Sequence, residues 1–318
     1  MKLSSLTRFN NVFSGEAKGR FLYQIWLYFD CIRCKMLYGF SPENYVAYRV
    51  WNLNHFTRKN ILAGRNKDRV EKLFNTGKDT SVIGDKEKFN QFFKVYVQRD
   101  WIYTKGKTES DIREFLQRNP VVMVKELRLS QGKGLYKLVS ADADDADVRE
   151  LARKNLLLEE FVEQHPAMAK LNPSSVNTCR IITVKDSAGD THIIAAGLRV
   201  GGKDAAVDNL HGGGAMYTLD LDLGMVTRGG VSSEGKRNIL LHPSTGHPMP
   251  GFVVPNWEHI CATVKKAAAL LDEFRFVGWD VAVTQRGCEL IEANILTGTT
   301  VYSNYDRPDF YDIVMRYK

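Results

Sequence analysis

Two short apolar runs near the carboxyl end of the sequence contain side chains that could hold a metal ion. The run GWDVAV, residues 278–283, includes Asp280, and the run GCELIEAN, residues 287–294, includes Glu292 and Asn294. Alternate side chains of a strand share one face of the sheet, so Glu292 and Asn294 should point to the same side. Carboxylate and amide oxygens are hard ligands, and they favour Mg²⁺ over Zn²⁺.

The turn between the two runs decides whether the carboxylates meet. If residues 285–287 form a three-residue hairpin loop with Gly287 in the left-handed conformation, Thr284 pairs with Cys288. Asp280 then lies directly opposite Glu292, with Cβ atoms about 5 Å apart. A two-residue loop would shift the register by one and place the two acids on opposite faces. Facing carboxylates repel each other and call for a cation between them, whereas the alternative is an exposed acidic strand.

An upstream segment could bind the phosphates that a protein-bound Mg²⁺ usually accompanies. The stretch VMVKELRLSQGKGLYKLVS is typical of two strands joined by a loop, with Lys125 in the first strand and Gly132, Lys133 and Gly134 at the loop tip. Glycines let backbone amides approach an anion closely, and lysine adds a point charge. The P-loop pattern is absent, and a plain hairpin turn is the alternative.

Three later segments add candidate ligand contacts. In LLLEEFVEQ, the backbone of Glu160, Phe161 and Val162 could contact a base, with Glu163 beside it; a strand leaving the core is the alternative. In NTCRIITV, Arg180 enters a strand, and in DNLHGGGAMY the glycines 212–214 permit close approach of the backbone to a ligand.

The positive charge of the chain is concentrated in its first third. The 318 residues carry a net charge of +7, and residues 1–110 hold 20 Lys and Arg against 10 Asp and Glu. This region could face a polyanion or an anionic membrane, or it could simply be solvated. No apolar run is long enough to span a bilayer and no signal peptide is evident, so we expect a cytoplasmic protein.

The order of patterns predicts helices first and a mixture of strands and helices afterwards. Residues 1–84 look helical, with Ser41 as a cap before Pro42. A stripe at helical spacing contains Phe21, Ile25, Trp26, Phe29, Ile32 and Met36. It should be core, and a membrane-surface or partner-docking helix is the alternative. In the same helix the spacing of Cys31 and Cys34 fits two cysteines on one face better than a metal site.

Hairpin-like segments after residue 120 indicate antiparallel sheets, hence an α+β fold.

The order of the motifs resembles that of the ATP-grasp superfamily. Asp85 and Lys86 open the block, followed by a strand lysine, GKG, EEFV, a strand arginine, the glycine-rich segment, the strand aspartate and ExN. More narrowly, residues 85–304 are similar to the sugar-transfer-associated ATP-grasp family. The resemblance implies two antiparallel-sheet subdomains that enclose ATP over residues 85–318, with a lid at about 120–157, after a helical basic region at 1–84.

The resemblance also implies roles for individual residues. Lys86, Lys125, Lys133 and the glycines 132 and 134 would bind the nucleotide phosphates, residues 160–162 would contact adenine, and Glu163 would lie near the ribose. Asp280, Glu292 and Asn294 would hold one or two Mg²⁺ ions. Arg180 would meet the transferred phosphate, Asn209 would lie near the substrate, and His211 would act as a base or contact the substrate.

The activity implied is ATP-dependent ligation of a carboxylate and an amine through an acyl phosphate. We expect an amino acid and a uronic acid or related sugar in surface polysaccharide synthesis, with the basic region holding an acidic glycan or a lipid-linked precursor. No nucleic acid partner is expected. The alternatives are an ATP-grasp kinase of a small molecule or sugar, and a non-catalytic protein that binds polyanions.

Overall fold

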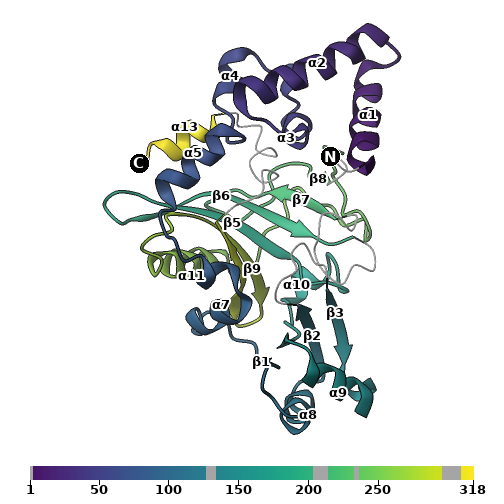
Figure 1. Cartoon of the computed structure of the whole chain (residues 1–318), viewed down its shortest axis with the longest axis vertical. Coiled ribbons are helices and arrows are strands. Elements are labelled where there is room, and N and C mark those ends of the chain that lie inside the picture. The colour runs from purple at the N-terminus through teal and green to yellow at the C-terminus, as the bar shows by residue number, and fades with distance from the viewer. Residues whose placement is uncertain (1–2, 127–133, 203–213, 233–235, 296–308) are drawn as a thin grey trace.

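The computed structural model describes residues 3–126, 134–202, 214–232, 236–295 and 309–318 (Figure 1). As the sequence predicts, helices come first and the first strand begins at Trp101. The helices before that strand are α1 (Leu3–Ala17), α2 (Phe21–Tyr38), α3 (Pro42–Ala47), α4 (His55–Lys59), α5 (Arg65–Phe74), α6 (Ser81–Gly84) and α7 (Lys86–Phe92).

Side-chain caps fix the beginnings of several of these helices. Ser41 accepts a hydrogen bond from the Asn44 N–H and Pro42 takes the first helical position, as predicted. The Asp85 carboxylate accepts from the backbone N–H groups of Glu87 and Lys88, which fixes the start of α7. The residue after this cap, Lys86, is a predicted site residue, so the cap also holds that residue in place.

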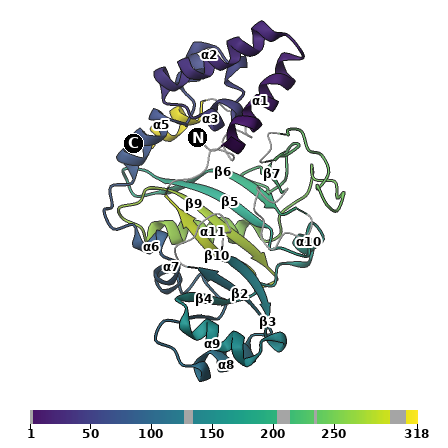
Figure 2. The same cartoon turned by 45° about the vertical axis from the view of Figure 1, so that its right-hand side comes forward.

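Two antiparallel sheets follow, which confirms the predicted α+β fold. The smaller sheet has the strand order β1-β4-β2-β3, and the larger has the order β10-β9-β5-β6-β7-β8 (Figure 2). The strands are β1 (Trp101–Tyr103), β2 (Val121–Glu126), β3 (Leu135–Val139), β4 (Leu156–Glu160), β5 (Thr178–Lys185), β6 (Thr191–Val200), β7 (Ala215–Thr218), β8 (Val231–Ser232), β9 (Phe276–Thr284) and β10 (Gly287–Asn294). The remaining helices are α8 (Glu109–Arg118), α9 (Asp145–Arg153), α10 (Pro166–Ala169), α11 (Trp257–Ala269) and α13 (Phe310–Met315).

The small sheet forms a separate layer below the large one. Helices α8 and α9 pack on it through a small apolar core that contains Ile112, Phe115, Val124 and Leu158. Sheet and helices extend from residue 101 to residue 160, a wider range than the 120–157 expected for the lid. The division of the chain at residue 84 stays a prediction.

One face of the large sheet is apolar. The opposite face is apolar at one end of the strands and polar at the other. Trp279 and Val281 of β9 point into the core formed with α11. On the opposite face, Phe276 packs under the N-terminal helices, in a second core with Phe74 of α5. Asp280 lies on the same face, past the end of these helices. It is buried, but it is not part of that core. This part of the sheet faces the small sheet and forms the floor of a cleft.

Helix α2 departs from the expectation that its apolar stripe is core. Except for the half-buried Ile25, the stripe is exposed, with Phe21 at 72% and Phe29 at 68% of full exposure, because the opposite face of the helix packs on the protein. Cys31 and Cys34 lie on that buried face as free thiols, in agreement with the prediction of two cysteines on one helix face. No helix in the described ranges is long and apolar enough to cross a membrane.

Candidate functional site

The β9–β10 hairpin brings Asp280 and Glu292 together by a route other than the predicted one. The loop has two residues, and Thr284 pairs with Gly287 rather than with Cys288, so the predicted three-residue loop is wrong. Gly287 has a φ of +132°, not the left-handed value expected. A β-bulge between Leu290 and Glu292 then inserts one extra residue and shifts the register back. Glu292 therefore pairs with Asp280.

The acids and the asparagine form one polar group on the floor of the cleft. The Asn294 amide donates to the Glu292 carboxylate at 3.1 Å, so these two side chains share a face as predicted. Crowding by surrounding protein and the adjoining Asp280 carboxylate raise the pKa of Glu292 to about 7, although 48% of its side chain is exposed. Near neutral pH Glu292 is therefore partly protonated, and the two carboxylates hold between one and two negative charges.

Two arginines surround Asp280. Arg180 of β5 makes a bidentate ion pair with it, including a 2.7 Å contact from Nη2 to Oδ2, and Arg199 of β6 donates from Nη1 to Oδ2 at 2.9 Å. Burial alone would raise the pKa of Asp280, but these cations hold it well below its usual range. The Arg180 guanidinium also lies 3.9 Å from Glu292. Two acids on β10 and β9 thus lie beside two cations on β5 and β6, across four neighbouring strands.

These donors fit the chemistry of a magnesium ion. The side chains of Asp280, Glu292 and Asn294 supply oxygen atoms, and a divalent cation beside Glu292 would relieve the repulsion that raises the pKa of that residue. Within the part of the chain that the structure describes, no group of three or more His, Cys, Asp and Glu side chains has a metal-binding arrangement. The third protein ligand would therefore be the amide, and water or phosphate would complete the shell.

A cavity of about 540 Å³, counted to its open mouth, lies between the two sheets. Both sheets contribute to its wall, which consists of Arg99, Met123, Lys125, Leu135, Glu159, Glu160, Phe161, Val162, Val176, Thr178 and Ile291. Four predicted nucleotide contacts, Lys125 and residues 160–162, therefore line one cavity, whereas Glu163 is not among its lining residues. Ile291, the bulge residue, also lines it.

The buried acid of this cavity is Glu159, which the sequence analysis did not single out. Glu159 is 1% exposed, forms an ion pair with Lys125, and accepts from the Asn90 amide at 2.6 Å. Glu160 instead points outward and accepts from the Asp100 N–H. Two adjacent acids on a strand must point to opposite faces, so the EE pair signalled that one of them is inward, but not which one.

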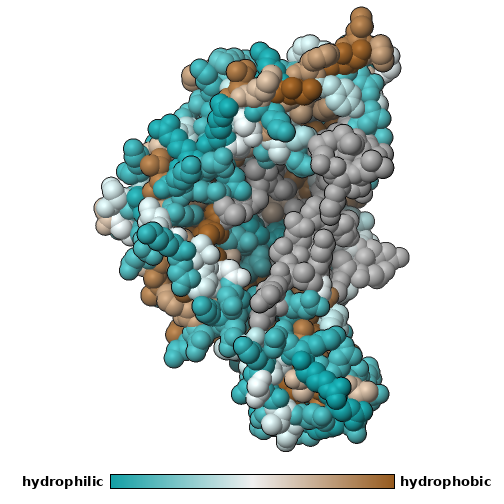
Figure 3. All heavy atoms as spheres, in the orientation of Figure 1, coloured by the Kyte–Doolittle hydropathy of each residue, from teal (hydrophilic) through white to brown (hydrophobic). Residues whose placement is uncertain are grey.

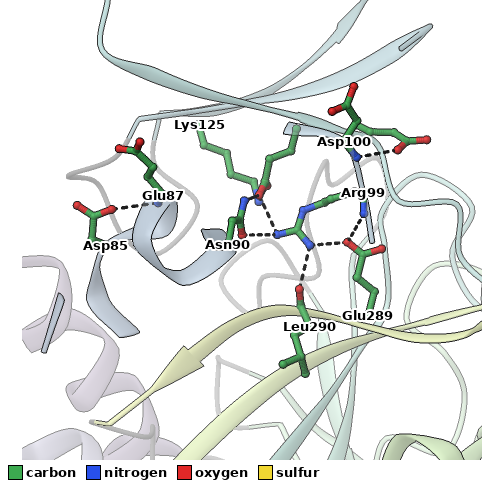
Figure 4. Close-up of polar contacts among 10 residues, drawn as sticks. Asp85, Glu87, Asn90, Arg99, Asp100, Lys125, Glu289 and Leu290 are labelled. Atoms are coloured by element: carbon green, nitrogen blue, oxygen red, sulfur yellow. Dashed lines mark hydrogen bonds and ion pairs between the residues drawn. The ribbon is translucent and has the colours of Figure 1, made fainter. Parts of the chain in front are cut away.

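Arg99 links the two sheets behind this cavity (Figure 4). Its guanidinium donates to Glu159 of the small sheet at 2.8 Å and to Glu289 of the large sheet at 2.5 Å. It also donates to the Leu290 carbonyl and to Asn90 of α7. The side chains of Arg99, Glu159 and Glu289 are at most 5% exposed. No motif marked Arg99, because its two charged partners, Glu159 and Glu289, are 60 and 190 residues away in the chain.

Lys86 connects the cavity with the acidic floor. Its ammonium donates to the Glu126 carbonyl at the end of β2 at 3.2 Å. Burial first, and then the neighbouring Lys125, lower the pKa of Lys86, while Glu292 opposes the shift. Lys86, Lys125 and Glu292 thus share one local electrostatic environment, as expected for residues of one site.

Other predicted residues cannot be placed. Gly134, by contrast, is described: it directly precedes β3, with a φ of +65°, and its carbonyl accepts from the Glu126 N–H. Gly132, Lys133, Asn209 and His211 lie outside the described residues. The predictions for these four residues stay predictions.

Comparison with known proteins found similar solved structures and a family model. Among solved structures, the chain is similar to the ATP-grasp ligase PsnB complexed with minimal precursor, Mg and ADP (11% identity, TM-score 0.48, 76% of this chain and 61% of PsnB). It is also similar to D-alanyl-alanine synthetase A from Vibrio cholerae O1 biovar eltor (11% identity, TM-score 0.46, 74% of this chain and 65% of that one). The chain thus spans less than two thirds of the length of each. No curated protein sequence matches it.

A family model gives the stronger match. The model described as sugar-transfer associated ATP-grasp matches residues 65–303, which is three quarters of the chain. The match includes both sheets, the cavity between them, and the Asp280–Glu292 floor. It begins at α5, the helix whose Phe74 packs against the large sheet. The chain belongs to the sugar-transfer associated ATP-grasp family.

Proposed function

We propose that the protein is an ATP-dependent carboxylate–amine ligase that works through an acyl phosphate. The observation that carries the proposal is that the Asp280–Glu292 pair and Arg180 adjoin Ile291 and Thr178, which line the cavity together with Lys125 and residues 160–162. This arrangement supplies cations for phosphates, oxygen ligands for a divalent ion, and a partly apolar cleft for a base. Phosphoryl transfer depends on positioning and charge stabilisation of this kind rather than on covalent protein chemistry.

The reaction needs activation of a carboxylate. A carboxylate is a poor electrophile because its leaving group would be oxide. One carboxylate oxygen attacks the γ-phosphorus of ATP, ADP leaves, and the product is an acyl phosphate. The amine nitrogen then attacks the carbonyl carbon, the C–O bond to phosphate breaks, and inorganic phosphate leaves with loss of a proton from nitrogen.

The described residues have separate roles in this scheme. Lys86 and Lys125 bind phosphate oxygens, and Arg180, already oriented by Asp280, stabilises charge on the transferring group. Asp280, Glu292 and Asn294 hold Mg²⁺, which supplies further charge neutralisation when bound. The Phe161 N–H already donates to the Val121 carbonyl, so it is not a donor for adenine. Contacts to the base therefore come from its neighbours and from Glu159.

For the substrates, we propose an amino acid and a uronic acid or related sugar of a surface polysaccharide. The association of the family with sugar transfer supports the sugar. The excess of Lys and Arg in residues 1–110 supports an acidic glycan or a lipid-linked precursor. A cytoplasmic location is part of the same proposal, since ATP and activated sugars are available there.

The decisive experiment measures ADP release over a set of amino acids with a uronic acid present, with mass analysis of the products. A ligase releases phosphate and gives an amide only when the amine is added, whereas a kinase gives a phosphorylated sugar without it. Asp280→Asn should abolish turnover while the fold survives. Asp186→Asn, in the exposed β5–β6 turn, is the matched control. Full activity of Asp280→Asn would refute the assigned metal site.

A further inference from the structure

An apolar face of α2 points away from the rest of the protein. Seven large side chains of this 18-residue helix are between 43% and 80% exposed: Phe21, Leu22, Trp26, Phe29, Ile32, Met36 and Leu37. At 3.6 residues per turn they fall on one side of the helix. Figure 3 shows apolar surface gathered at the end of the molecule that α2 forms in Figure 1. We call these seven residues the α2 ridge. Contiguous apolar surface of this kind marks an interaction site.

The orientation of α2 is fixed, so the ridge cannot turn inward. Asp30, on the opposite side of the helix, is 4% exposed and accepts from Arg58 at 2.8 Å and from the Tyr45 hydroxyl at 2.8 Å. Leu27 and Cys34 of the same side are fully buried. Rolling the helix would break a buried ion pair and expose these residues, which is unfavourable. The ridge is therefore a permanent surface feature.

Positive charge surrounds the α2 ridge. Lys18 and Arg20 come just before α2, while Arg33 and Lys35 lie within it, and all four are exposed. Of the nearby acids, Asp30 is buried and paired with Arg58, and Glu16 forms an ion pair with Arg49. Residues 1–60 contain nine Lys and Arg but only three Asp and Glu. A partner that binds the α2 ridge must therefore combine apolar groups with negative charge.

We propose that α2 docks the protein on the headgroup region of an anionic lipid bilayer. Aromatic and aliphatic side chains on one face, with basic residues beside them, are the features of helices that lie in the membrane interface. Each basic residue near an anionic surface adds attraction, and long basic side chains can reach headgroups while their stems stay apolar.

The position of α2 in the molecule agrees with docking on a lipid bilayer. In Figures 1 and 2, α2 lies across one end of the molecule, and the lid helices α8 and α9 lie at the other end. A docked protein would therefore keep its lid and cleft away from the bilayer and free to move. A second copy of the chain fits less well, because a twofold contact along the ridge would bring Arg33 and Lys35 of both chains into one interface, and α2 has no exposed acid to pair with them. The docking surface does not depend on the ligase reaction.

The test is co-sedimentation of the full chain with vesicles of phosphatidylcholine alone and of phosphatidylcholine mixed with phosphatidylglycerol. We expect binding to the mixed vesicles only, with weaker binding at high salt. The double variant Leu22→Glu/Phe29→Glu should bind the mixed vesicles at least roughly tenfold more weakly. The reason is that it lacks two apolar side chains that the bilayer would bury. Val95→Glu/Leu223→Glu changes two equally exposed side chains outside α2 and should bind like the parent. Arg33→Gln/Lys35→Gln, which keeps the ridge, should lose part of the preference for phosphatidylglycerol.

Three results would overturn the proposal. The first is equal or absent binding to the two kinds of vesicle. The second is unchanged binding of Leu22→Glu/Phe29→Glu. The third is a stable dimer, measured by sedimentation velocity without lipid, that becomes a monomer in that variant, because the ridge would then be covered by a second copy. Thermal unfolding of each variant checks that the fold is retained, and none of these measurements needs the enzyme activity.

Discussion

Replacing Arg99 by methionine should destabilise the protein strongly and in a pH-dependent way. The change leaves Glu159 and Glu289 buried without their shared cation, although Lys125 still contacts Glu159. Removing one partner of a buried ion pair costs about 3–5 kcal/mol. For a chain of this size, that free energy corresponds to a fall in Tm on the order of 10 °C.

The pH dependence follows from the pKa of Glu159. Burial would raise that pKa, but in the parent protein Arg99 and Lys125 hold it below the usual value. The carboxylate therefore stabilises the parent above the usual carboxyl pKa, and this stability is lost only as the pH falls through the lowered value. Without Arg99, burial outweighs Lys125 and the pKa of Glu159 rises above the usual value. The Arg99→Met variant then loses most stability at high pH. The difference in Tm between the parent and the variant should therefore be larger at pH 8 than at pH 5.

The assay is thermal unfolding followed by circular dichroism, with Arg118→Met as the matched control. Arg118 also forms two ion pairs, with Asp100 and Glu114, but its side chain is 54% exposed. Such exposed pairs contribute about 0–1 kcal/mol, so Arg118→Met should change the Tm little. If Arg99→Met lost no more stability than Arg118→Met, or if its loss did not depend on pH, the description of the Arg99 cluster would be wrong.

Three further predictions concern other parts of the molecule. Gly287→Ala should destabilise by about 1–3 kcal/mol, because a Cβ there would lie 2.7 Å from the His259 ring; Gly189→Ala, also at positive φ but in open space, should cost less in thermal unfolding. Cys31 should resist a thiol reagent at pH 8 until the protein unfolds, since burial raises its pKa to about 12; fast labelling of this residue in the native protein would contradict its burial. Asn294→Ala should raise the magnesium concentration needed for ADP formation, and an unchanged requirement would remove Asn294 from the ligands.

The hairpin shows how far the sequence could predict the site. Two short apolar runs predicted both strands, and the alternation of side chains along a strand placed Glu292 and Asn294 on one face. The turn was predicted wrongly, yet Asp280 still pairs with Glu292 because a bulge at Ile291 offsets the shorter loop. A bulge depends on packing against neighbouring strands and has no local sequence signal here. The contact was therefore predicted for a reason that the structure does not support.

The Arg99 cluster and the α2 ridge show two other limits. Arg99 draws its partners from α7, β4 and β10, and only the tertiary fold brings these segments together. In α2, helical spacing predicted an apolar face but could not say whether another element covers it. Both faces of α2 carry apolar side chains, and the face with Asp30 is buried because Arg58 and Tyr45 satisfy that carboxylate. A single buried acid, rather than the apolar stripe, determined which way the helix faces.

The N-terminal helices also determine where the site can be. On the face of the large sheet opposite α11, Phe276 and Ile182 are covered by the core that contains Phe74 of α5. Further along the same strands, Arg180 and Asp280 occupy that face where this core ends. The change from apolar to charged side chains along β5 and β9 therefore coincides with the edge of the helical layer. Among the described residues, this helical layer leaves uncovered the part of the sheet that carries Arg180 and Asp280, so the N-terminal helices limit where the site can lie.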